Sequence, residues 1–171
     1  MEYTLRFNEL DIVNIAEKYN YEPNETTILD MVQEIQDKKY LDYNNLQKLA
    51  YWKSPRSASY IKKNQNEYVI EISRISLTTM NDRLRIQSLT LLDGVGWPTA
   101  SCILHWFHRD PYPILDFRTL WSLSITQPQS YSYEFWKEYT DICRNIVARN
   151  SINMRTLDKA LWKYSELHQR V

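Results

Sequence analysis

Apolar residues follow helical spacing wherever a period can be recognised along this chain. The C-terminal part is the clearest case, because Leu157, Ala160, Leu161, Tyr164 and Leu167 recur at intervals of three and four residues. That spacing places them on one face of an α-helix. No stretch alternates polar and apolar residues as a half-buried strand does. The pattern therefore predicts an all-α fold.

Helix starts are marked by polar residues whose side chains accept hydrogen bonds from first-turn amides. We expect helices to begin near Asn8, Asn24, Asp42, Asn66, Asn81, Trp97, Asp116, Tyr131 and Asn153. Prolines in the links Lys53–Arg56 and Asp110–Pro113 stop one helix before the next begins.

The composition limits the architecture. With 171 residues, of which 43% are apolar, the chain is long enough for a full core, as a single compact helical domain over residues 1–171 or as two small lobes that share an interface. No run approaches the roughly 18 apolar residues that span a bilayer. We expect a cytoplasmic protein without a membrane partner.

Cysteine usage argues against a metal or disulfide framework. Cys102 and Cys143 are the two cysteines, and both fall on amphipathic segments, where they are expected as buried thiols. Neither an iron–sulfur cluster nor a structural zinc site is expected. The set Cys102, His105 and His108 drifts around a helix and lacks a fourth ligand, so we expect no metal site there.

Charge is balanced overall but unevenly distributed. Residues 1–42, expected to form acidic N-terminal helices, carry ten acidic and four basic side chains, whereas residues 43–171 carry eleven and seventeen. Residues 43–66 contain no acid, and their bases alternate with aromatic residues: Lys48, Lys53, Arg56, Lys62 and Lys63 with Tyr43, Tyr51, Trp52 and Tyr60. This pairing is typical of nucleic-acid surfaces, although a solvated helix face over an aromatic core edge has the same composition.

The two glycines of the chain, Gly94 and Gly96, share one pentapeptide between two helical segments. A chain of this length has about a dozen glycines at the average of roughly 7%. One glycine is enough for a tight corner between helices that needs a positive φ. The second favours backbone amides kept bare for a ligand.

This segment resembles the helix-hairpin-helix DNA glycosylases of the endonuclease III-like superfamily. The family has a Leu-Pro-Gly-Val-Gly hairpin, then Thr-Ala opening a second helix, then an apolar run into an aspartate that starts another helix. The residues that match are Gly94, Val95, Gly96, Thr99, Ala100 and Asp116. The specific similarity covers residues 84–123, within the hairpin and aspartate region 82–123.

The resemblance implies a protein that grips double-stranded DNA through the hairpin and excises a modified or mispaired base. The implied DNA contacts are Gly94, Val95, Gly96, Trp97 and Thr99, joined by Lys53 and Arg56 from the basic segment. A monovalent cation held by loop carbonyls accompanies the hairpin in some family members. Asp116 is the implied catalytic carboxylate, and Trp52, Tyr60 and Trp121 are candidate walls of a base pocket.

Departures from the family pattern narrow this expectation. The Schiff-base lysine of bifunctional members is replaced by Pro98, which predicts a monofunctional glycosylase that uses water, and the four-cysteine cluster is absent. Asp93 stands where the family commonly has proline, and its carboxylate repels phosphate unless it caps a helix or pairs with Arg109 or a cation.

Two alternatives stay open. Asp116 also fits an ordinary helix N-cap, and in that case the protein would be a non-catalytic DNA-binding module. A structural helical protein whose acidic N-terminal region engages a partner fits the charge split but not the paired glycines.

Overall fold

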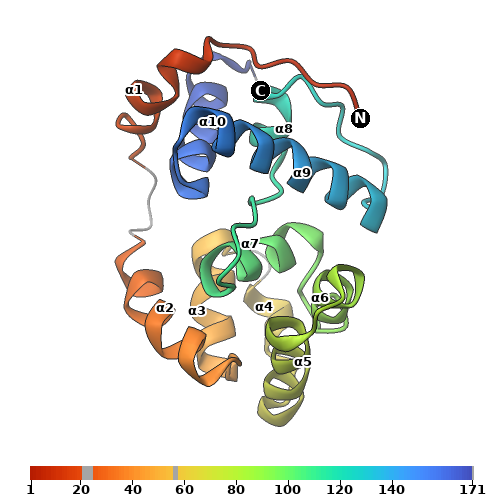
Figure 1. Cartoon of the computed structure of the whole chain (residues 1–171). Coiled ribbons are helices and arrows are strands. Elements are labelled where there is room, and N and C mark those ends of the chain that lie inside the picture. The colour runs from red at the N-terminus through yellow and green to blue at the C-terminus, as the bar shows by residue number, and fades with distance from the viewer. Residues whose placement is uncertain (21–24, 56–57, 171) are drawn as a thin grey trace. The chain divides into compact units, whose positions relative to one another are not determined.

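Helices form all the regular structure in the part of the chain that the computed structural model describes, residues 1–20, 25–55 and 58–170. The predicted all-α class is therefore confirmed. The chain divides into two compact units (Figure 1). Unit 1 combines Met1–Asn20 with Pro111–Val171, and unit 2 is Tyr21–Asp110.

Unit 2 is organised around helix α7 (Trp97–Phe107), which packs against α2 (Thr26–Lys38), α3 (Tyr43–Lys53) and α6 (Asp82–Leu89) (Figure 1). The other helices of this unit are α4 (Ala58–Ile61) and α5 (Asn66–Thr78). Buried residues occupy nearly every side of α7: Thr99, Ala100, Ser101, Cys102, Ile103, Leu104, Trp106 and Phe107. A helix that is buried all round belongs to the core of its unit.

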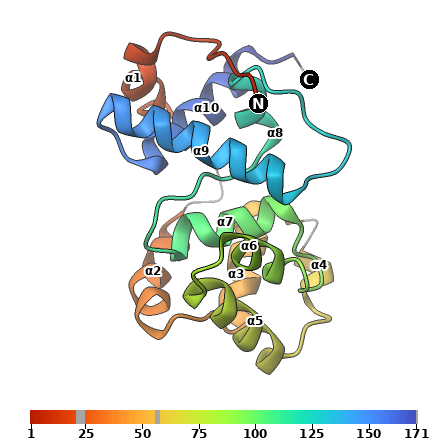
Figure 2. The same cartoon turned by 45° about the vertical axis from the view of Figure 1, so that its right-hand side comes forward.

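Unit 1 is built on helix α10 (Met154–His168), which contacts α1 (Ile12–Ala16), α8 (Phe117–Ser122) and α9 (Tyr133–Asn150) (Figure 2). A short 3₁₀ helix, η1 (Glu9–Asp11), precedes α1. The N-terminal segment is tied to the end of α8, because the amides of Thr4 and Arg6 each donate, at 3.0 Å, to the carbonyls of Leu123 and Ser122 respectively.

Helix starts agree closely with the capping residues in the sequence. First-turn amides donate to the side chains of Asn8, Asp42, Asn81, Asp116 and Asn153. The expected start near Asn24 lies outside the described residues.

Three details differ from the predicted pattern. Helix α9 begins at Tyr133 with Ser132 as its cap, two residues after the predicted Tyr131. The short helix α4 follows a proline-containing link and was not predicted. Leu167 continues the apolar spacing of α10, yet it is 54% exposed because the last turn extends past the buried stretch. None of the described helices has the length and apolar character needed to cross a membrane.

Candidate functional site

The hairpin, residues 92–96, joins α6 to α7 in unit 2 and needs glycine at one of its two positions. Gly94 has φ 78°, in the left-handed region that favours glycine. Gly96 has φ −88° and ψ −179°, which any residue can adopt. A Cβ added at Gly96 would meet one neighbour, the Cδ of Pro98, at an ordinary 3.8 Å. Nothing in the described chain therefore requires glycine at position 96.

Several backbone amides at this turn are left without an acceptor. The Val95 amide donates to the Leu92 carbonyl at 3.1 Å, and the Ala100 amide donates to Gly96 at 2.8 Å. The amides of Gly94, Gly96, Trp97 and Thr99 meet no acceptor among the described residues. Gly96 is exposed and is the N-cap of α7 without a side-chain cap. Bare amides at a helix N-terminus attract anions.

Side chains of the hairpin contribute to the core rather than to the exposed face. Val95 and Thr99 are only 4% and 6% exposed, and Trp97 is half-buried. A ligand at this turn would thus meet backbone more than side chains. The carbonyls of Leu92 and Asp93 already accept hydrogen bonds within the unit, so a cation bound there would share them.

Asn64 anchors the hairpin, a role that no motif in the sequence predicted. Its side-chain oxygen accepts the Asp93 amide at 2.9 Å, and its Nδ2 donates to the Asp93 carbonyl at 2.9 Å and to the Ile61 carbonyl at 3.0 Å. Asn64 is buried at 9% exposure. The end of α4 is therefore fixed to the hairpin.

This anchor brings part of the basic segment to the hairpin. Lys62 and Lys63 are exposed and directly precede Asn64. The Lys63 ammonium lies 5.9 Å from the ring centroid of Tyr60, which is 58% exposed. Lys53 is half-buried at the last position of α3. Arg56 lies outside the described residues.

Trp52 is buried in unit 2. It is 6% exposed, and its ring meets that of Trp106 edge-on at 5.6 Å. It is a core residue of unit 2, as the alternative interpretation of the aromatic residues expected.

Asp93 is exposed and makes no ion pair with Arg109 or any other described residue. Its uncompensated negative charge therefore lies next to the bare amides of the hairpin.

Asp116 lies in unit 1 as the N-cap of α8. Its Oδ1 accepts the amide of Arg118 at 3.0 Å, and the residue is half-buried. This is the geometry expected of an ordinary helix N-cap, in which Oδ1 accepts the first-turn amide and Oδ2 takes no part in the capping hydrogen bond.

A buried hydroxyl pair fixes the backbone on both sides of that carboxylate. The Thr119 hydroxyl donates to the Asp116 carbonyl at 2.8 Å and lies 2.9 Å from the Tyr139 hydroxyl. Tyr139 donates to the Ile114 carbonyl at 2.8 Å. Burial raises the pKa of Tyr139 well above its usual range, so the phenol keeps its proton and remains a donor.

The helix that Asp116 caps also lines a cavity of about 280 Å³ within unit 1. Phe117, Leu120 and Trp121 of α8 form one part of its wall, and Arg6 and Gln127 belong to the rest. The Arg6 guanidinium lies 4.5 Å from the centre of the Trp121 ring, and Arg6 Nε donates to the Trp121 carbonyl at 2.6 Å. Trp121, which the sequence predicted as a pocket wall, thus lines a cavity formed by described residues of unit 1.

The structure therefore groups the predicted residues into two sets. The hairpin, Lys53 and Tyr60 belong to unit 2, and Asp116 and Trp121 belong to unit 1. Within the described ranges, no three His, Cys, Asp or Glu side chains are gathered as a metal site requires. No protein family, characterised protein or solved structure matches this chain.

Proposed function

We propose that this protein binds double-stranded DNA through the hairpin and excises a modified or mispaired base as a monofunctional DNA glycosylase. The observation that carries the proposal is Gly96, an exposed helix N-cap that is glycine without a conformational or steric reason in the described chain. A close approach by another molecule's backbone supplies such a reason.

The DNA phosphate is the ligand that suits this turn. A phosphate oxygen can accept the bare amides of Gly96, Trp97 and Thr99 in a field made positive by α7. Such contacts hold a duplex in register without reading its sequence. The exposed Lys62 and Lys63 beside Asn64 add charge that offsets Asp93.

Asp116 is the residue that we propose as the catalytic carboxylate for cleavage of the N-glycosidic bond. Breaking an N-glycosidic bond leaves an oxocarbenium-like sugar, which a fixed carboxylate stabilises while water attacks. The hydroxyls of Thr119 and Tyr139 hold the backbone around Asp116 rigid, as preorganised electrostatic stabilisation requires. Pro98 has no amine, so no Schiff base forms at that position.

A target base must leave the helical stack before its bond is cut. The cavity beside α8 offers Phe117 and Trp121 as apolar surfaces for an extruded base. A base that stacks on Trp121 would compete with Arg6 for the ring.

A non-catalytic DNA-binding module is the second candidate, and one observation favours it. The hydrogen bond from the Arg118 amide gives Asp116 a structural role as a cap, which would be kept without any chemistry.

Base release separates the two candidates. The protein is incubated with duplexes that carry alkylated, oxidised, deaminated or bulky modified bases, and free base is measured by chromatography, with mild alkali revealing abasic sites. Release of one class of base supports the glycosylase. Salt-dependent binding with no release from any duplex supports the binding module, and the absence of duplex binding contradicts both.

A further inference from the structure

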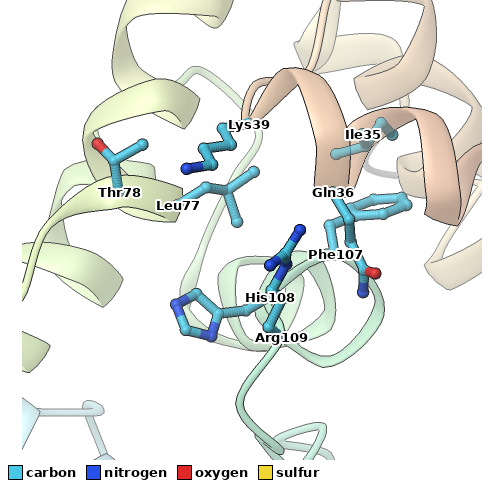
Figure 3. A pocket seen from close by; sticks show the side chains of 8 residues that line it. All are labelled: Ile35, Gln36, Lys39, Leu77, Thr78, Phe107, His108 and Arg109. Atoms are coloured by element: carbon cyan, nitrogen blue, oxygen red, sulfur yellow. The ribbon is translucent and has the colours of Figure 1, made fainter.

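A second cavity, of about 190 Å³, lies within unit 2, where the C-terminal ends of α2, α5 and α7 meet (Figure 3). Its lining has two parts. Ile35, Leu77 and Phe107 supply an apolar wall, and Lys39 and Arg109 supply positive charge. The hairpin is at the opposite end of α7, so this cavity is separate from the DNA-binding turn.

The two cations reach the cavity from different elements. Figure 3 shows Lys39, at the C-cap of α2, and Arg109, just after α7, extending toward the same space. Both residues are exposed, and neither forms an ion pair with a carboxylate in the described ranges. No carboxylate is among the residues that line the cavity, and the Asp110 carboxylate faces His108, with its Oδ2 3.8 Å from His108 Nδ1.

The partial negative charge at the helix C-termini offsets only part of the positive charge of Lys39 and Arg109. The C-terminus of a helix carries a partial negative charge that favours a nearby cation. Two full cations that converge on one hollow without a carboxylate still leave an excess of positive charge. Gln36 adds an amide at the same wall, and Arg109 offers the paired donors that suit phosphate.

The apolar wall indicates the organic part of the ligand. Ile35 is fully buried and Phe107 is 2% exposed, so both are held rigidly behind the apolar wall, while Leu77 is partly exposed at the cavity. An apolar cavity of about 150 Å³ accepts a benzene ring, and this one is larger. A phosphate monoester carries a charge of about −1.5 to −2 at pH 7, which balances two cations.

We propose that this cavity binds a phosphate monoester whose organic group is one small apolar or aromatic ring, with Lys39 and Arg109 holding the phosphate and Leu77 contacting the ring. Arg109 immediately precedes Asp110, the last residue of unit 2. This proposal does not depend on the proposed glycosylase activity, because the cavity shares no residue with the hairpin or with Asp116.

Calorimetric titration of the full chain with phenyl phosphate, inorganic phosphate and benzoate tests the site. Phenyl phosphate should bind roughly tenfold more tightly than inorganic phosphate, because its ring buries apolar surface. Lys39→Gln and Arg109→Gln should each weaken phenyl phosphate roughly tenfold. Leu77→Ala should weaken phenyl phosphate and leave inorganic phosphate unchanged.

Arg74→Gln is the matched control, because Arg74 is an exposed cation of the same unit that pairs with Glu71 and does not line the cavity. It should leave phenyl phosphate affinity unchanged, and thermal melting without ligand confirms that each variant folds. Equal weakening by Arg74→Gln, equal affinity for benzoate, or no binding of phenyl phosphate would overturn the proposal. A loss of stability in the Lys39 and Arg109 variants with unchanged affinity would show that these cations only compensate helix ends.

Discussion

The side chain of Asn64 both donates to the carbonyl of Asp93 and accepts from its amide, each at 2.9 Å. These two hydrogen bonds join residues 29 positions apart and hold the first half of the hairpin to the end of α4. The turn is therefore built before any ligand arrives, so DNA binding need not include the cost of ordering it.

Asn64→Ala removes this anchor. We expect a loss of about 1–3 kcal/mol in the free energy of unfolding, because buried partners lose their hydrogen bonds. Duplex affinity should fall further than stability explains, since the amides lose their fixed positions. Asn44→Ala, at an exposed position of α3, is the control. Chemical denaturation and fluorescence anisotropy measure the two effects, and unchanged duplex affinity in a folded Asn64→Ala protein would contradict the role of the anchor.

Gly96→Asp separates folding from DNA binding. Asparagine and aspartate are good N-caps at an extended position, so Gly96→Asn and Gly96→Asp should keep or raise the melting temperature. Both side chains occupy the amides that a phosphate would use, and aspartate adds repulsion. Affinity should therefore fall for Gly96→Asn and more for Gly96→Asp. If both variants bind duplex as the parent does, Gly96 is not a phosphate contact.

Lys63→Ala tests the charge beside the hairpin. If Lys63 neutralises one phosphate, its removal should reduce the slope of log affinity against log salt by about one unit. Arg74→Ala is the control, because Arg74 also pairs with an aromatic ring, that of Tyr40. The same salt titration of Lys53→Ala and Arg56→Ala tests whether these two basic residues, predicted from the sequence as DNA contacts, neutralise phosphates. An unchanged slope removes a residue from the interface.

Reaction with damaged duplex in the presence of borohydride should give no trapped covalent adduct. The position that would supply the Schiff-base amine is Pro98, and reduction traps only an imine. Denaturing gel electrophoresis measures the adduct, with a commercial bifunctional glycosylase as a positive control. A trapped band would mean that another amine attacks the sugar.

Local features of this fold could be predicted from sequence. Asp42 and Asn153 cap helices at the predicted places because capping depends on a few adjacent residues. The positive φ of Gly94 follows from the same local chemistry.

Long-range features could not be predicted. Asn64 has the sequence context of an ordinary loop residue, and its partner is far away in the chain. Trp52 and Tyr60 occupy similar basic surroundings, yet one is core and the other is exposed. The assignment of residues 1–20 and 111–171 to one unit depends on packing of α1 against α10, which no local pattern encodes.

Asp116→Asn separates a catalytic role of this carboxylate from its role as a helix cap. Asparagine caps a helix about as well as aspartate, so the variant should fold and bind duplex nearly as tightly as the parent. Only the negative charge is lost. A carboxylate that stabilises a developing sugar cation contributes a few kcal/mol, or roughly 10²–10³ in rate.

The measurement is single-turnover release of the base, with anisotropy on the same duplex and Asp110→Asn, an exposed carboxylate outside the cap, as the control. Asp116→Asn should slow base release by roughly 10² or more, while duplex affinity and the rate of the Asp110→Asn control stay nearly unchanged. Release at the parent rate would make Asp116 a cap alone and contradict the proposed excision mechanism.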